Sequence, residues 1–124
     1  MMIKVSIIND RIGRVIDFCE RIEQVLDIPH ELRLIPIDAP FLNLDHCGYP
    51  VIASFCATSS RPNELSEAPY MLVCTDYDDF EEIKDSIAHE LVHYEQWRDG
   101  KSFTERGVAV RSRNILKLME DYGN

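Results

Sequence analysis

The chain has 124 residues, and its 13 Lys and Arg residues against 22 Asp and Glu residues give it a formal net charge of −9 at pH 7. With 45% hydrophobic residues it can bury a core as one domain over residues 1–124, which argues against a disordered or low-complexity chain. Its acidity argues against broad binding to nucleic acid or anionic membranes, because both require a positive surface.

The N-terminal apolar run is short. Residues 2–8 (MIKVSII) predict a β-strand, and polar residues follow from Asn9 onward. This run is too short for the hydrophobic region of a signal peptide, and no stretch of the chain is long and apolar enough to cross a membrane. We therefore expect a cytoplasmic protein.

A first helix is predicted over residues 11–27, where apolar residues recur at the spacing of a helix that lies on a sheet. Three further strands are predicted at residues 31–37, 50–58 and 70–75. Together these elements predict an α/β (α+β) fold, with a mixed four-stranded sheet and the first helix on one face of it.

The four cysteines form no C-x-x-C pair, so a zinc ribbon is not expected. Cys19, Cys56 and Cys74 lie inside apolar segments, which predicts buried free thiols. Cys47 lies beside His46 in a predicted loop.

A second helix is predicted over residues 79–99, and acidic residues crowd its start. They are Asp76, Asp78, Asp79, Glu81, Glu82 and Asp85. Their charge complements the positive end of the helix dipole, and their spacing lacks the central Gly and closing Glu of a calcium-binding EF-hand. Gly100 is expected to end this helix, and a last helix is predicted over residues 103–122.

The second helix contains the pattern H-E-x-x-H at His89, Glu90 and His93. At about 100° per residue, His93 lies about 40° and Glu90 about 100° around the helix from His89, so all three share one sector. The neighbouring sector is apolar and consists of Ile83, Ile87, Leu91 and Tyr94. This helix therefore has a polar face beside its core face.

Two neutral imidazoles one helical turn apart can bind a single Zn²⁺ ion. Glu90 then lies beside the metal and can accept a proton from a water that the ion activates. We therefore expect one zinc ion, with His89 and His93 as ligands and Glu90 as the general base. The alternative is that the two histidines share this spacing by chance, as surface or core side chains.

A catalytic zinc needs a third protein ligand. The candidates are Glu105, His30, Asp45, His46 and Cys47. We favour Glu105, because the predicted last helix places it on the buried stripe, where a carboxylate requires a metal or a donor. The alternative is a capping box, in which Glu105 bonds the backbone amide of Ser102.

With these residues at these spacings, the chain resembles the zincins, and more narrowly the small gluzincin-like metallopeptidases of the minigluzincin type, which have relatives among phage and bacterial zincin-like proteins. The resemblance implies a strand-helix-strand sheet before the active-site helix and a glutamate ligand from the following helix. It also implies a zinc-dependent peptidase fold over most of the chain, with Glu90 as general base and acid.

The chain departs from the larger zincin branches. No Gly and third His follow His93 as in the metzincins, and the larger gluzincins place their glutamate farther downstream than Glu105. Tyr94, Tyr122 and Arg111 are candidates for polarising a substrate carbonyl. Packing is the preferred interpretation for the two tyrosines, and solvation for the arginine.

The sequence predicts a zinc-dependent hydrolase, a small metallopeptidase that acts on a peptide or protein substrate. The edge strand, assigned to residues 50–58, could align an extended peptide by strand addition. The alternative is a catalytically weak or inactive zincin-like binding or regulatory module, phage-related in origin, in which the metal is structural. The same ligand set also accepts iron, cobalt or nickel.

Two further features carry weaker hypotheses. Trp97 flanks the metal sector and could wall a substrate pocket, although core packing is the favoured alternative. Residues 98–117 hold six basic residues against two acidic ones, so the last helix could dock an acidic protein partner or DNA. A solvated helix face is the favoured alternative for this stretch.

Overall fold

The computed structural model describes residues 3–5, 13–26, 28, 32–37, 39–43, 50–57, 69–76, 79–101 and 104–123. The elements run in the order β1 (Ile3–Val5), α1 (Gly13–Val25), β2 (Leu32–Ile37), β3 (Ala53–Cys56), β4 (Tyr70–Cys74), α2 (Phe80–Arg98) and α3 (Val108–Gly123). The predicted mixed fold, with four strands and three helices in this order, is confirmed over these residues.

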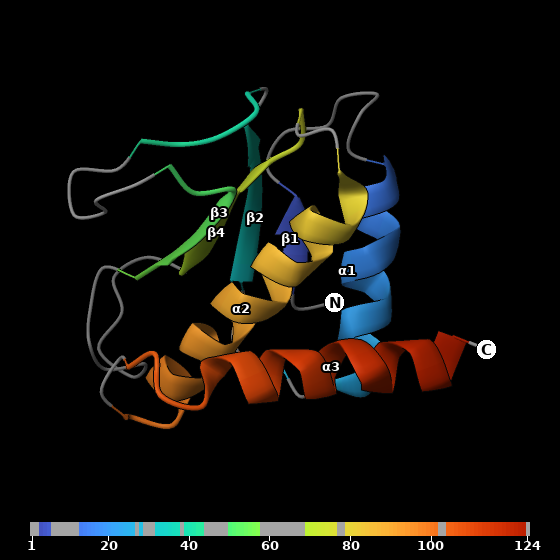
Figure 1. Ribbon diagram of the computed structural model, residues 1–124, viewed down its shortest axis with the longest axis vertical. Coiled ribbons are helices and arrows are strands. Elements are labelled where there is room, and N and C mark those ends of the chain that lie inside the picture. The colour runs from blue at the N-terminus through green and yellow to red at the C-terminus, as the bar shows by residue number, and fades with distance from the viewer. Residues whose placement is uncertain are drawn as a thin grey trace.

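The four strands form one sheet in the order β1-β2-β4-β3 (Figure 1). The first three strands in that order are parallel, and α1 connects β1 to β2. β3 pairs antiparallel with β4 and occupies the edge of the sheet. α2 contacts β3, so an edge strand borders the helix that carries H-E-x-x-H.

The core lies between the sheet and two helices on one of its faces. Side chains from both helices and from the two central strands surround one small internal space: Cys19, Ile22, Leu32, Leu34, Met71, Ile87 and Leu91. The strand residues Leu32 and Leu34 are buried there, whereas Arg33 between them is half-buried on the opposite face. The apolar stripe predicted for the first helix thus lies on the sheet.

Local sequence sets both ends of α2. Asp79 caps its start, where the side chain accepts a hydrogen bond of 3.0 Å from the Glu81 N–H. At the other end Gly100 has a φ of 71°, and the amides of Gly100 and Lys101 donate to the carbonyls of Trp97 and Gln96, in the pattern of a Schellman motif. The predicted helix end at Gly100 is confirmed.

α3 begins at Val108, later than the predicted start at residue 103. Gly107 immediately before it has a φ of 78°, a conformation that breaks the helical path. The buried stripe of α3 consists of Val108, Ser112, Ile115 and Met119. α3 runs across α1 and α2 at the bottom of Figure 1 and contacts both helices.

The described cysteines, Cys19, Cys56 and Cys74, are free thiols, as predicted. Cys19 and Cys74 are buried, and Cys56 is half-buried. Burial raises the pKa of Cys19 to about 12 and that of Cys74 to about 11, so both thiols stay protonated near neutral pH. Cys47 lies outside the described residues.

Among the described residues, no helix combines the length and apolar character that crossing a membrane would require.

Candidate metal centre

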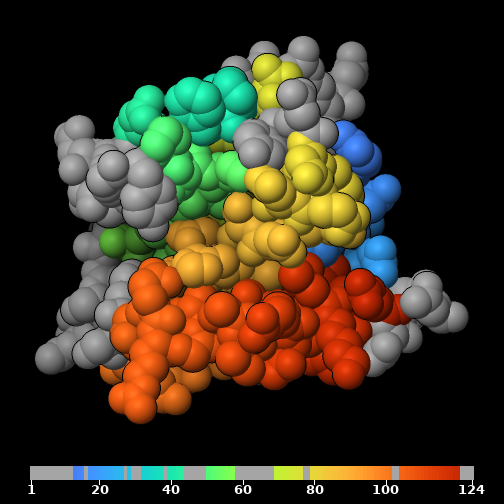
Figure 2. All heavy atoms as spheres, in the orientation of Figure 1, coloured from blue at the N-terminus to red at the C-terminus, as the bar shows by residue number. Residues whose placement is uncertain are grey.

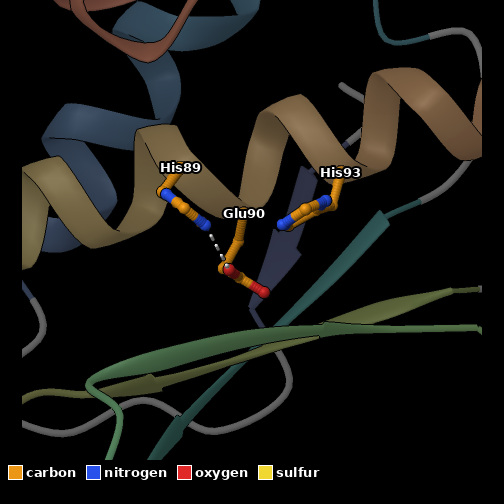
Figure 3. A group of neighbouring side chains, drawn as sticks. All are labelled: His89, Glu90 and His93. Atoms are coloured by element: carbon orange, nitrogen blue, oxygen red, sulfur yellow. Dashed lines mark ion pairs between the residues drawn. The ribbon is translucent and has the colours of Figure 1, made fainter. Parts of the chain in front are cut away.

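The three motif side chains lie together on the face of α2 that is turned toward the sheet. Figure 3 shows Glu90 between the imidazoles of His89 and His93, with all three pointing away from the helix axis on the side of the strands. Each residue offers a ligand atom within 4.8 Å of the other two. The predicted shared sector of these residues is therefore present in the folded chain.

Glu105 joins the two histidines from the segment between α2 and α3. Its two carboxylate oxygens lie 3.0 Å from the Nε2 atoms of His89 and His93, one oxygen on each imidazole. In a tetrahedral zinc site with bonds of about 2.0 to 2.1 Å, two ligand atoms are about 3.3 Å apart. The two observed distances are those of ion pairs and lie about 0.3 Å below this separation, so the arrangement is compatible with a zinc ion bound between these side chains after a small displacement.

The reason given from sequence for choosing Glu105 was wrong. Glu105 precedes α3, and its side chain is 71% exposed, so it does not lie on a buried helical stripe. The capping-box alternative also fails as stated, because Glu105 is not in the first turn of a helix that begins at Val108. Ser102 lies outside the described residues. A turn before the helix, rather than the helix itself, brings this carboxylate to the histidines.

The hydrogen bonding of His93 identifies the atom that is available to a cation. Its Nδ1 lies 3.0 Å from Gln96 Oε1, an amide oxygen that can only accept a hydrogen bond, so Nδ1 carries the proton. In a neutral imidazole the Nε2 lone pair then faces the Glu105 carboxylate across 3.0 Å. Two acceptors at this distance repel each other unless a proton or a metal ion lies between them.

Glu90 is held by a different contact from those that join Glu105 to the two histidines. Its Oε1 accepts a hydrogen bond of 2.7 Å from the backbone N–H of Phe55 in β3, and its Oε2 lies 3.9 Å from His89 Nε2. Burial raises the pKa of Glu90 above its usual value, and the Phe55 amide and the two imidazoles reverse only part of that rise. A raised carboxyl pKa suits a group that must both accept and release a proton.

A cavity of about 750 Å³ opens beside these residues. One wall is the strand segment from Pro50 to Phe55, and the other is the face of α2 that carries Asp85, His89 and His93, with Glu105 at one end. In Figure 2 the green residues of β3, the gold residues of α2 and the orange residues before α3 meet on the face in view. Among the described residues that line the cavity, the charged side chains other than the histidines are Asp85, Glu90 and Glu105, all of them acidic.

The backbone of β3 offers hydrogen-bonding groups to this cavity. The carbonyl of Ile52 accepts from the Cys74 N–H of β4, whereas the Phe55 N–H points the opposite way, to Glu90. Because backbone groups alternate in direction along a strand, the N–H of Ala53 shares the direction of the Phe55 N–H. The outer edge of β3 therefore faces the cavity from Ala53 to Phe55, whereas at Val51, just before the strand, the same edge pairs with Leu42.

The structure places Trp97 in the core. Its side chain is 2% exposed and packs against the rings of Phe55 and Tyr94, at centroid distances of 5.9 Å from each, and Trp97 does not line the cavity. The hypothesis that Trp97 walls a substrate pocket is corrected accordingly, because its ring points to the apolar side of α2. Its packing instead supports the residue whose amide binds Glu90.

The candidate carbonyl-polarising groups are engaged elsewhere. Tyr94 is 1% exposed in the core, and Arg111 makes a two-pronged ion pair with Glu95, with N–O distances of 2.9 and 2.8 Å. The expected solvation of Arg111 is thus replaced by a contact that joins α3 to α2. The side chain of Tyr122 and the other candidate ligands, His30, Asp45, His46 and Cys47, lie outside the described residues.

Two participants were not found from the sequence. Gln96 follows His93 by three residues, a helical spacing at which side chains meet, and this signal could have identified it. The Phe55 amide carried no signal, because a backbone N–H is present at almost every residue and its partner Glu90 is 35 positions away.

Comparison with protein-family models, with curated proteins and with solved structures finds no match for this chain. Any functional assignment therefore depends on the motif residues and on the geometry of the site.

Proposed function

We propose that the protein is a zinc-dependent hydrolase, specifically a small metallopeptidase of the zincin type. His89, His93 and Glu105 hold one zinc ion, and Glu90 is the general base. The observation that carries this proposal is the convergence of two imidazole Nε2 atoms on the two oxygens of Glu105, each at 3.0 Å. The side chain of Glu90 lies beside them. Such a set of donors binds zinc and leaves a coordination position open for catalysis.

Glu90 and the Phe55 amide would carry out the proton transfer and the positioning that the reaction requires. When bound, the zinc ion supplies Lewis acidity, which polarises a peptide carbonyl and acidifies water. Glu90 accepts the proton at Oε2, the oxygen nearer His89, while the Phe55 N–H holds Oε1 in place. Its raised pKa allows Glu90 to keep that proton and pass it to the departing amine.

The cavity and the strand edge support an extended peptide as substrate. A chain lying along β3 would bond to backbone groups near Ala53 and pass beside the metal ligands. We further propose a cytoplasmic location, which the free thiols of Cys19, Cys56 and Cys74 support, since such thiols persist in reducing compartments.

Metal content tests the proposal directly. Protein purified without a chelator and without a His tag is expected to contain about one zinc ion per chain by mass spectrometry, since two imidazoles and a carboxylate form a complete ligand set. His89→Ala should lose the ion, and Glu105→Ala should hold it more weakly. A wild-type protein that takes up no zinc even after loading would overturn the proposal.

Replacing Ala53 with Pro tests the docking edge. Proline removes the N–H that faces the cavity and leaves the hydrogen bonds between β3 and β4 in place, as an edge position tolerates. Turnover of an extended peptide is expected to fall about tenfold, since leaving a backbone hydrogen-bonding partner unpaired costs about 1–3 kcal/mol, while zinc content stays at the wild-type level. Ala53→Val, which keeps the N–H, is the matched control. Wild-type turnover in the proline variant would exclude this strand as the docking edge.

A further inference from the structure

Gln96 makes three contacts that connect two of the proposed metal ligands. Its Oε1 lies 3.0 Å from His93 Nδ1 and also accepts a hydrogen bond of 3.3 Å from the Thr104 N–H. Its Nε2 donates a hydrogen bond of 2.9 Å to the Thr104 carbonyl. One side-chain amide therefore binds a histidine on α2 and both backbone groups of the residue that precedes Glu105.

The contacts with Thr104 determine which terminal atom of the Gln96 side chain is the oxygen and which is the nitrogen. The Thr104 carbonyl needs a donor and the Thr104 N–H needs an acceptor, so Nε2 and Oε1 have one consistent orientation. With Oε1 on His93, the proton of that imidazole is placed on Nδ1 and the lone pair on Nε2. Gln96 thus selects the form of His93 that binds a metal.

The position of Glu105 needs such an anchor. Its side chain is 71% exposed, so packing does not hold it, and the segment that carries it lies between two glycines with positive φ, Gly100 and Gly107. A Cβ built at either glycine would meet no atom within 4 Å, so no side chain of the described residues packs against the Cβ side of the backbone at these two positions. The paired hydrogen bonds from Gln96 to Thr104 attach this segment to the rigid helix α2.

We propose that Gln96 is a positioning residue that sets two metal ligands at once. It keeps His93 Nε2 directed toward the ion, and it anchors Thr104 so that Glu105 reaches both imidazoles. This inference rests on the metal site of the proposed function. It adds a mechanism by which a solvent-exposed carboxylate becomes a defined ligand.

Zinc affinity measured by competition with a chromophoric chelator tests this role. Gln96→Ala is expected to bind zinc about 10- to 100-fold more weakly than the wild type, the range found when a hydrogen-bond partner of a metal ligand is removed. Gln24→Ala, the same substitution on the exposed side of α1, is the matched control and should bind as the wild type does. Cooperative thermal unfolding of each metal-free variant checks that it folds.

Two further variants separate the two contacts. Gln96→Glu keeps an acceptor for His93 but loses the donor to the Thr104 carbonyl, so its affinity should lie between those of the wild type and Gln96→Ala. In a Glu105→Ala background, Gln96→Ala should cost less affinity than in the wild type, because only the His93 contact remains to be lost. Cobalt-loaded Gln96→Ala should show weaker visible absorption than the cobalt-loaded wild type if Glu105 leaves the ion.

The outcomes distinguish this inference from the proposed function. Equal zinc affinity in the wild type and Gln96→Ala would overturn the role of Gln96 and leave the metal site intact. If Gln96→Ala lowers zinc affinity by the same factor in the wild type and in the Glu105→Ala background, the proposal that Gln96 anchors Glu105 would be overturned. A wild-type protein without zinc affinity would overturn the proposed function and this inference together, whereas zinc affinity without peptide turnover would overturn only the proposed catalysis.

Discussion

Glu90→Gln is expected to lower peptide turnover by about 10²- to 10⁴-fold, the contribution of a positioned general base. The amide keeps an oxygen that can accept the 2.7 Å hydrogen bond from the Phe55 N–H, so the side chain can stay in place. Zinc content should therefore equal that of the wild type. Because burial disfavours the ionised carboxylate, the variant should unfold at the same temperature or a higher one.

The measurements are kcat and KM on a peptide library, zinc content, and thermal unfolding. Glu120→Gln, on the exposed side of α3, is the matched control and should leave all three unchanged. Full turnover in Glu90→Gln would remove the general base from the mechanism. A zinc-loaded wild type that cleaves no peptide would favour the alternative of a binding or regulatory module with a structural metal.

Trp97→Ala is expected to lower the free energy of unfolding by about 3–5 kcal/mol, the cost of removing a large buried aromatic side chain. Trp97 contacts Phe55 and Tyr94, and these two rings also meet edge to face at a centroid distance of 5.8 Å. The substitution would leave an empty space behind the strand residue whose amide binds Glu90. The main effect of Trp97→Ala should therefore be a lower free energy of unfolding.

Chemical denaturation followed by circular dichroism measures this effect, since Trp97 is the single tryptophan and its fluorescence disappears with it. Trp97→Phe keeps an aromatic ring and should lose clearly less stability than Trp97→Ala. Unchanged stability combined with a raised KM for peptides would contradict core packing and restore the hypothesis of a substrate-pocket wall.

The helices and strands were predictable because their signals are local. Apolar residues at helical spacing located α1 and α2, a β-branched apolar run located β1, and an alternating run located β2, because burying one face of an element imposes a period on its sequence. The start of α3 was predicted too early. Gly107 marks the true start, but a glycine in that position is also compatible with the helix that the apolar pattern suggested.

The motif triad was accessible from the sequence for the same reason. His89, Glu90 and His93 belong to one helix, and the 3.6-residue period fixes their relative directions without knowledge of any other part of the chain. The prediction that they share a polar face therefore required only that the helix form.

The rest of the site was decided by tertiary structure. Glu105 reaches the histidines through a turn, so its position depends on the backbone angles at Gly100 and Gly107 and on the anchor at Gln96. The Phe55 amide reaches Glu90 only because β3 is the edge strand beside α2. Helical spacing predicts directions within one rigid element, whereas a distance between two elements depends on every torsion and packing contact that joins them.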